Sequence, residues 1–162
     1  MRGLGRRTKE TGRLRLRFVL ALTALIALSI AAVAQTRPAL PPNDLNGQWH
    51  GQWTSPSGYL FATTLDLKVA GDGTAEGQFV WTLKRSPLPQ EQRKLGMSGT
   101  EFVSGKVDIA AGIVSLAGTR KDDPNDVIFT DRYRLVVGEN GRSLAGVSRN
   151  LGDWDGLVFL QR

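Results

Sequence analysis

From Leu45 to the C-terminus, hydrophobic and polar residues alternate with a period of two. No eleven-residue stretch keeps the apolar spacing of an amphipathic helix, and turn-forming residues interrupt the alternation about every ten residues. The pattern predicts eight β-strands: Leu45–Thr54, Tyr59–Val69, Thr74–Lys84, Thr100–Val107, Ile113–Arg120, Val127–Val137, Ser143–Arg149 and Trp154–Gln161. All connections but one are short enough to join antiparallel neighbours, so we expect a meander of hairpins.

The alternation also predicts which side of each strand is buried. In the first strand Trp49 and Trp53 share one side, and His50 lies on the other side between two glutamines. The second, third and last strands repeat this arrangement, so all four tryptophans of the chain fall on one apolar face. An antiparallel sheet with a single buried side has this pattern. We therefore expect His50 on the solvated surface, without a functional role.

Glycines recur on the apolar face, one or two to a strand: Gly47, Gly51, Gly77, Gly118, Gly146 and Gly156. Glycine inside a strand usually marks a bend, a bulge or a close approach. Bulky aromatic residues that alternate with glycine suit a sheet bent far enough to close on itself. We predict an all-β domain, a single eight-stranded antiparallel up-and-down barrel. A β-sandwich is the alternative, but it needs crossing connections and only Arg85–Gly99 is long enough to cross.

The N-terminal part has a different pattern. Residues 1–17 are basic and polar, and they precede an apolar run over residues 18–34 that closes on Ala32-Val33-Ala34. These are the three parts of a secretory signal peptide, so we expect a signal helix that is cleaved before Gln35. The alternative is an uncleaved anchor in the inner membrane. The expected division is residues 1–34 for the signal peptide, 35–44 for a Pro-rich linker and 45–162 for the barrel domain.

The distribution of charge excludes a function that the overall composition suggests. The chain has a formal net charge of +6, which is common in proteins that bind nucleic acid. However, residues 1–34 hold seven of the 21 basic residues and one of the 15 acidic residues, and the remainder is neutral. We expect no nucleic-acid partner, and no membrane contact once the leader is removed. The chain has no cysteine, so the barrel has neither disulfides nor thiolate chemistry.

Three short motifs carry a resemblance to known barrels. They are Gly47-Gln48-Trp49 in the first strand, the turn Gly71-Asp72-Gly73 with Gly77 after it, and Trp154 in the last strand. Together they resemble the avidin-like and lipocalin-like barrels of the calycin group, which begin with G-x-W on strand one. The resemblance implies a barrel over Leu45–Arg162, typical of small secreted bacterial domains.

Other calycin motifs match less closely. Lipocalins carry T-D-Y before a late strand, whereas Thr130-Asp131 is followed here by Arg132. They also place a basic residue near the end of the chain over the first tryptophan, and Arg149 and Arg162 are the candidates for this role. The polar residues by which avidins bind biotin have no counterparts, so biotin binding is not implied.

Few residues offer catalytic or metal-binding chemistry. His50 is the only histidine and is expected outside the barrel, which argues against a two-histidine metal site and a serine triad. The loop Lys121–Asp126 gathers three carboxylates, but Asp, Asn and Pro are also what an ordinary turn uses. We expect no metal, no cofactor and no enzymatic activity.

Two carboxylates, those of Glu101 and Asp131, fall on the apolar face by alternation. Glu101 shares its side with Val103, and Asp131 shares its side with Phe129 and Tyr133. Two carboxylates near an apolar lumen could bind a ligand amine or act as acid and base. A position at a strand end on a wet rim is the simpler interpretation, and it is the one that we expect.

An eight-stranded barrel encloses either a packed core or one small ligand. We therefore predict an exported protein, periplasmic or extracellular, that binds a small apolar or aromatic ligand or is purely structural. The candidate ligand-binding residues are the inward-facing aromatic ones: Trp49, Trp53, Phe61, Trp81, Tyr133 and Trp154. The alternative is a protein-interaction or inhibitor module that acts through the loop Arg85–Gly99 and the hairpin tips. A cavity of several hundred cubic ångströms favours ligand binding.

Overall fold

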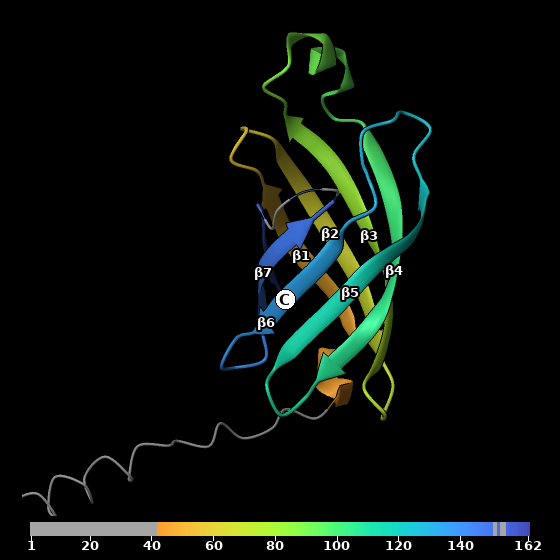
Figure 1. Cartoon of the computed structure of the whole chain (residues 1–162), viewed down its shortest axis with the longest axis vertical. Helices are drawn as coiled ribbons and strands as arrows, with labels where there is room; N and C mark the ends of the chain where they lie inside the picture. The colour runs from red at the N-terminus through yellow and green to blue at the C-terminus, as the bar shows by residue number, and fades with distance from the viewer. Residues whose placement is uncertain (1–41, 151, 153–154) are drawn as a thin grey trace, which may run out of the picture. The chain divides into compact units, whose positions relative to one another are not determined.

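The computed structural model describes residues 42–150, 152 and 155–162 (Figure 1). The expected signal peptide, its alternative as a membrane anchor and most of the linker lie outside the described residues, and so does Trp154. In the part of the chain that is described, no helix is long and apolar enough to cross a membrane.

The described residues form eight antiparallel strands that follow one another around a closed barrel. The strands are β1 (Gly47–Thr54), β2 (Leu60–Val69), β3 (Thr74–Arg85), β4 (Ser98–Asp108), β5 (Ile113–Asp122), β6 (Arg132–Val137), β7 (Ser143–Arg149) and β8 (Gly156–Gln161). The 3-10 helix η2 (Pro42–Leu45) precedes β1, and the 3-10 helix η3 (Pro89–Lys94) lies within the β3–β4 connection. Because β8 pairs with β1, the predicted up-and-down barrel is confirmed and the β-sandwich is excluded.

The largest difference from the predicted strands is at the start of β6, which begins at Arg132 and not at Val127. The carboxylate of Asp123 accepts hydrogen bonds from the backbone N–H groups of Val127 (3.0 Å) and Ile128 (2.9 Å). These donors are therefore not available to a neighbouring strand, and the segment folds as a loop. As a result Phe129 is 69% exposed, so the expectation that it shares the interior with Tyr133 is wrong.

The connections alternate between the two ends of the barrel (Figure 1). The tight turns β2–β3, β4–β5 and β6–β7 lie at one end together with η2, and we call this the closed end. The remaining four connections, which include η3 and the long β5–β6 loop, lie at the opposite end, and we call this the open end. The barrel is filled near the closed end, where the following side chains are buried: Leu67, Val69, Ala75, Val107, Val114, Val137 and Leu144.

Arg162 and η2 cover the closed end. Trp49 is fully buried, and its indole Nε1 donates a hydrogen bond to the backbone oxygen of Leu45 (3.1 Å). The guanidinium carbon of Arg162 lies 4.6 Å from the centre of the Trp49 ring. Arg162 also donates hydrogen bonds to the backbone oxygens of Asn46 (3.1 Å) and Asp44. Of the two candidates for the basic residue over the first tryptophan, Arg162 is therefore the one that covers it.

Inward-facing glycines allow neighbouring strands to approach closely. A methyl group at Gly51 would lie 1.9 Å from the backbone oxygen of Phe159, and one at Gly146 would lie 2.1 Å from that of Arg134. No side chain fits at these distances, so both positions require glycine for the packing of adjacent strands. This agrees with the close approach expected from glycines on the apolar face.

The outer surface is partly as predicted. His50 is exposed, as the alternation in β1 requires. However, the outer face of β6 and β8 is less polar than expected, because Val136, Leu157 and Phe159 are 49%, 58% and 46% exposed.

We expect Arg162→Ala to lower the free energy of unfolding by about 1–2 kcal/mol, because it removes a cation–π contact and two hydrogen bonds from a charged donor. Urea unfolding of protein with an unmodified C-terminus measures this. Arg134→Ala, a change on the outer face of β6, is the matched control and should stay within about 0.5 kcal/mol of the parent protein. Equal effects of the two substitutions would contradict the role of Arg162 at the closed end.

Candidate functional site

A cavity of about 340 Å³ lies at the open end of the barrel. Six aromatic residues line it: Trp53, Tyr59, Phe61, Trp81, Tyr133 and, from the β5–β6 connection, the largely exposed Phe129. Residues of η3 and of the β1–β2, β5–β6 and β7–β8 connections form its rim. The volume is at the lower end of the range for small-molecule sites, and it is what an eight-stranded barrel can enclose.

Contacts between rings hold the aromatic wall together. Trp53 and Trp81 both meet Phe61 edge to face, with ring centroids 5.7 and 6.4 Å apart. Trp81 also lies nearly parallel to Tyr133 at 6.2 Å and stacks on Phe79 at 4.7 Å. These are favourable aromatic geometries, so the wall is preformed.

The carboxylate of Glu101 lies behind this wall and is completely buried. Its Oε2 accepts hydrogen bonds from the indole Nε1 of Trp81 (3.1 Å) and the hydroxyl of Tyr133 (2.5 Å). Its Oε1 accepts a hydrogen bond from the backbone N–H of Asp131 (2.7 Å). The interpretation of Glu101 as a residue on a wet rim is therefore wrong, because three protein donors replace water at this carboxylate.

A second chain of hydrogen bonds begins at Trp53. Its indole Nε1 donates to the hydroxyl of Ser148 (2.8 Å), which donates in turn to Oδ2 of Asp131 (2.8 Å). Asp131 is only partly buried and lines the cavity. Because the backbone of Asp131 also binds Glu101, the two chains join into one polar layer. The layer orients both tryptophans of the cavity wall.

Burial dominates the acid–base properties of this layer. It raises the pKa of Glu101 to about 7, although the hydrogen bonds from Tyr133 and the Asp131 backbone act in the opposite direction. Burial likewise raises the pKa of the Asp131 carboxyl and raises that of the Tyr133 hydroxyl well above its usual value. Glu101 thus takes up a proton near neutral pH.

Two inward-facing glycines make room for the polar layer. A methyl group at Gly118 would lie 2.2 Å from Oε1 of Glu101, and one at Gly156 would lie 2.4 Å from both the Ser148 hydroxyl and the Trp53 indole nitrogen. The sequence predicted glycines on the inner face. It did not show that polar groups occupy the space beside them.

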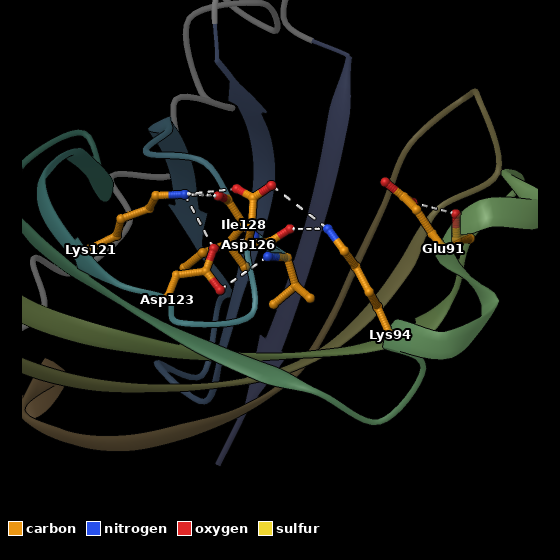
Figure 2. A network of polar contacts seen from close by, with 8 residues as sticks. Glu91, Lys94, Lys121, Asp123, Asp126 and Ile128 are labelled. Atoms are coloured by element: carbon orange, nitrogen blue, oxygen red, sulfur yellow. Dashed lines mark hydrogen bonds and ion pairs between the residues drawn. The ribbon is translucent and has the colours of Figure 1, made fainter.

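Ion pairs join the two sides of the rim (Figure 2). The Nζ of Lys94 on η3 donates to the backbone oxygen of Asp126 (2.6 Å) and lies 3.7 Å from its carboxylate. The Nζ of Lys121 lies 3.2 Å from Asp123 and 3.7 Å from Asp126, and it donates to the backbone oxygen of Ile128 (2.6 Å). The carboxylates of the acidic loop therefore shape and tether the β5–β6 connection. No group of residues suited to a metal ion is present in the described part of the chain.

No family model, curated protein or solved structure matches the chain significantly. The closed eight-stranded barrel is consistent with a calycin-like fold, and the architecture alone supports this likeness.

The structure brings together four of the six aromatic residues that the sequence singled out. Trp53, Phe61, Trp81 and Tyr133 line the cavity. Trp49 lies at the closed end instead, because it precedes Trp53 by four positions on β1 and is therefore roughly 13 Å away along the strand. Sequence analysis gave no ligand-binding role to Tyr59 or to η3, which it treated only as part of the loop Arg85–Gly99 of the interaction alternative. The length of that loop was the signal for the rim residues of η3.

We expect the free energy of unfolding to fall by about 2–3 kcal/mol as the pH rises from about 4.5 to about 7.5. In this window native Glu101 still holds a proton that the unfolded chain, with an ordinary glutamate pKa, has already released. The native state binds more protons, so raising the pH favours unfolding. Urea unfolding at a series of pH values measures the slope.

The variant Glu101→Gln tests the assignment of this slope. We expect it to remove most of the pH dependence, with Asp131 responsible for the remainder. Its stability should be lower below about pH 5, because the amide nitrogen, unlike either oxygen of the protonated carboxyl group, cannot accept a hydrogen bond from the surrounding donors. An unchanged slope in Glu101→Gln would assign the titration to another group.

We expect Gly118→Ala to destabilise the barrel by about 1–3 kcal/mol, because the methyl group must displace the Glu101 carboxylate or the Thr130 side chain. Gly71→Ala is the matched control, since a methyl group there meets nothing within 4 Å. Thermal unfolding of both variants gives the comparison. If the two glycines tolerate alanine equally well, the polar layer is not as tightly packed as described.

Proposed function

We propose that this protein binds a small apolar or aromatic molecule in the cavity at the open end of its barrel. The observation that carries the proposal is the 340 Å³ space lined by six aromatic residues. The interior near the closed end is filled by aliphatic side chains, whereas the interior near the open end is hollow. A ligand that covers the aromatic wall removes apolar surface from water, which is favourable.

The rigidity of the wall supports the interpretation of the cavity as a binding site and not as a packing defect in the core. Hydrogen bonds to Ser148 and Glu101 orient the indoles of Trp53 and Trp81, and Phe61 is held between the two rings. A preformed site does not have to order its side chains when the ligand arrives, so less affinity is lost.

Within this proposal the protein is a binding protein and not an enzyme. The carboxylates nearest the cavity, those of Glu101 and Asp131, accept hydrogen bonds that hold the wall in position. We further propose that binding takes place in the periplasm or outside the cell, to which the signal peptide expected over residues 1–34 would export the protein.

One observation favours the alternative of a protein-interaction module. Three apolar residues of the β3–β4 connection, Leu88, Leu95 and Met97, are each 38–40% exposed. They flank η3 at the rim, where a protein partner could cover them. A partner bound there should compete little with a ligand deep in the barrel, which separates the two functions.

We expect N-phenyl-1-naphthylamine, a neutral aromatic probe, to bind one to one with a rise in its fluorescence. Trp53→Ala should weaken binding about tenfold or more, because this indole forms part of the cavity wall. Trp49→Ala, on the same strand and the same face, should instead cost roughly 3–5 kcal/mol of stability and leave the affinity of the folded protein unchanged. Trp49→Phe serves if the alanine variant does not fold.

The two tryptophans thus provide a matched pair for the titration. Absence of saturable one-to-one binding would contradict the proposed function. Equal loss of affinity in the Trp53 and Trp49 variants would place the probe somewhere other than the cavity.

A further inference from the structure

The charged side chains that line the cavity are mainly acidic. Among the described residues these acids are Glu91, Asp126, Asp131 and Asp155, and Lys94 is the basic residue. The carboxylate of Glu101 adds a further acidic group directly behind the wall. The cavity combines an apolar wall with an excess of carboxylates, and this combination restricts the ligand that it suits.

Lys94 is already engaged. Its ammonium group donates to the backbone of Asp126 and also faces the Asp126 carboxylate, which Lys121 approaches from the other side (Figure 2). The charge of Asp126 is therefore balanced within the rim itself. Neither lysine is positioned to receive an anionic ligand without giving up contacts that tether the loop.

Asp131 is in a different situation. It lies on the cavity wall, and the hydrogen bond to its Oδ2 comes from the neutral hydroxyl of Ser148. The nearby negative charge of Asp155 adds to the effect of burial in raising the pKa of Asp131. This part of the cavity therefore has a negative potential, and a bound cation would relieve it.

The aromatic wall favours the same kind of ligand. Trp53, Phe61, Trp81 and Tyr133 present rings to the space beside Asp131. Aromatic faces attract organic cations, and they also receive the apolar body of such a molecule. An anion in the same place would meet both the ring faces and the carboxylates unfavourably.

We propose that the cavity is selective for a small organic amine in its protonated form. Its ring system lies against Trp53, Phe61 and Trp81, and its ammonium group lies beside Asp131. This inference rests on the proposed function of the cavity and adds the charge of the ligand to it.

Three probes of nearly equal shape test the selectivity: tryptamine, tryptophol and indole-3-propionate. They share an indole ring and a two-carbon chain, and they end in a cation, a neutral hydroxyl and an anion. Calorimetry at about pH 8, where amines are protonated and carboxyls are largely ionised, gives their affinities. Displacement of N-phenyl-1-naphthylamine reports whether they share its site. We expect tryptamine to bind about tenfold more tightly than tryptophol and indole-3-propionate to bind most weakly.

Asp131→Asn tests the position of the ammonium group, because the amide oxygen can still accept the hydrogen bond from Ser148. We expect the affinity for tryptamine to fall about tenfold and the affinity for tryptophol to change less than about twofold. Asp66→Asn, a change on the outer face of β2, is the matched control and should leave all three affinities unchanged.

The outcomes separate this inference from the function on which it rests. If tryptophol binds as tightly as tryptamine, or if indole-3-propionate binds most tightly, the selectivity for amines is overturned while the ligand-binding function stands. An equal loss for all three probes in Asp131→Asn overturns the role of Asp131 as the group that faces the ammonium. If neither these probes nor N-phenyl-1-naphthylamine bind, the proposed function itself fails.

Discussion

The buried carboxylate of Glu101 is the constraint on which the open half of the barrel depends. A carboxylate without water is strongly unfavourable unless hydrogen-bond donors surround it. Trp81, Tyr133 and the backbone of Asp131 supply these donors, so their positions are dictated by the carboxylate and not by close packing alone. The aromatic rings held in this way form the wall of the cavity. They cannot move inward to fill it without leaving Glu101 unsatisfied.

The two ends of the barrel share the same alternation of inward-facing and outward-facing side chains but differ in structure. At the closed end, short turns bring the strands together, and Trp49 is sealed between η2 and the guanidinium of Arg162. At the open end, the β3–β4 and β5–β6 connections are long, and an ion pair and a hydrogen bond between Lys94 and Asp126 join them across the rim. The arrangement at the closed end excludes water from the filled part of the interior. The arrangement at the open end leaves an entrance to the cavity.

The period-two alternation and the glycines of the inner face together predicted the barrel, because the alternation indicates strands joined by short turns and the glycines indicate a strongly bent sheet. It failed where a side chain satisfies the backbone: Asp123 takes the N–H groups of Val127 and Ile128, and this interaction leaves no trace in hydrophobic periodicity. Alternation placed Glu101 inward, but its donors come from distant positions that meet only when strands pair. Alternation also predicts which face of the sheet a residue occupies but not its position along the barrel axis, so it could not distinguish Trp49 from Trp53.

At the open end, the charged side chains of the rim stabilise the fold, whereas a carboxylate on the cavity wall faces the proposed ligand. Lys94 and Lys121 balance Asp126 and Asp123, and these contacts hold η3 and the β5–β6 loop in place. The positive charge near the entrance is therefore committed to the fold. Asp131 is different, because its carboxylate accepts a hydrogen bond from the neutral hydroxyl of Ser148 and borders the cavity. A positively charged ligand can pair with this carboxylate, whereas a negatively charged ligand must compete for the lysines whose contacts tether the rim. Selectivity for a cation then follows from the same interactions that keep the barrel open.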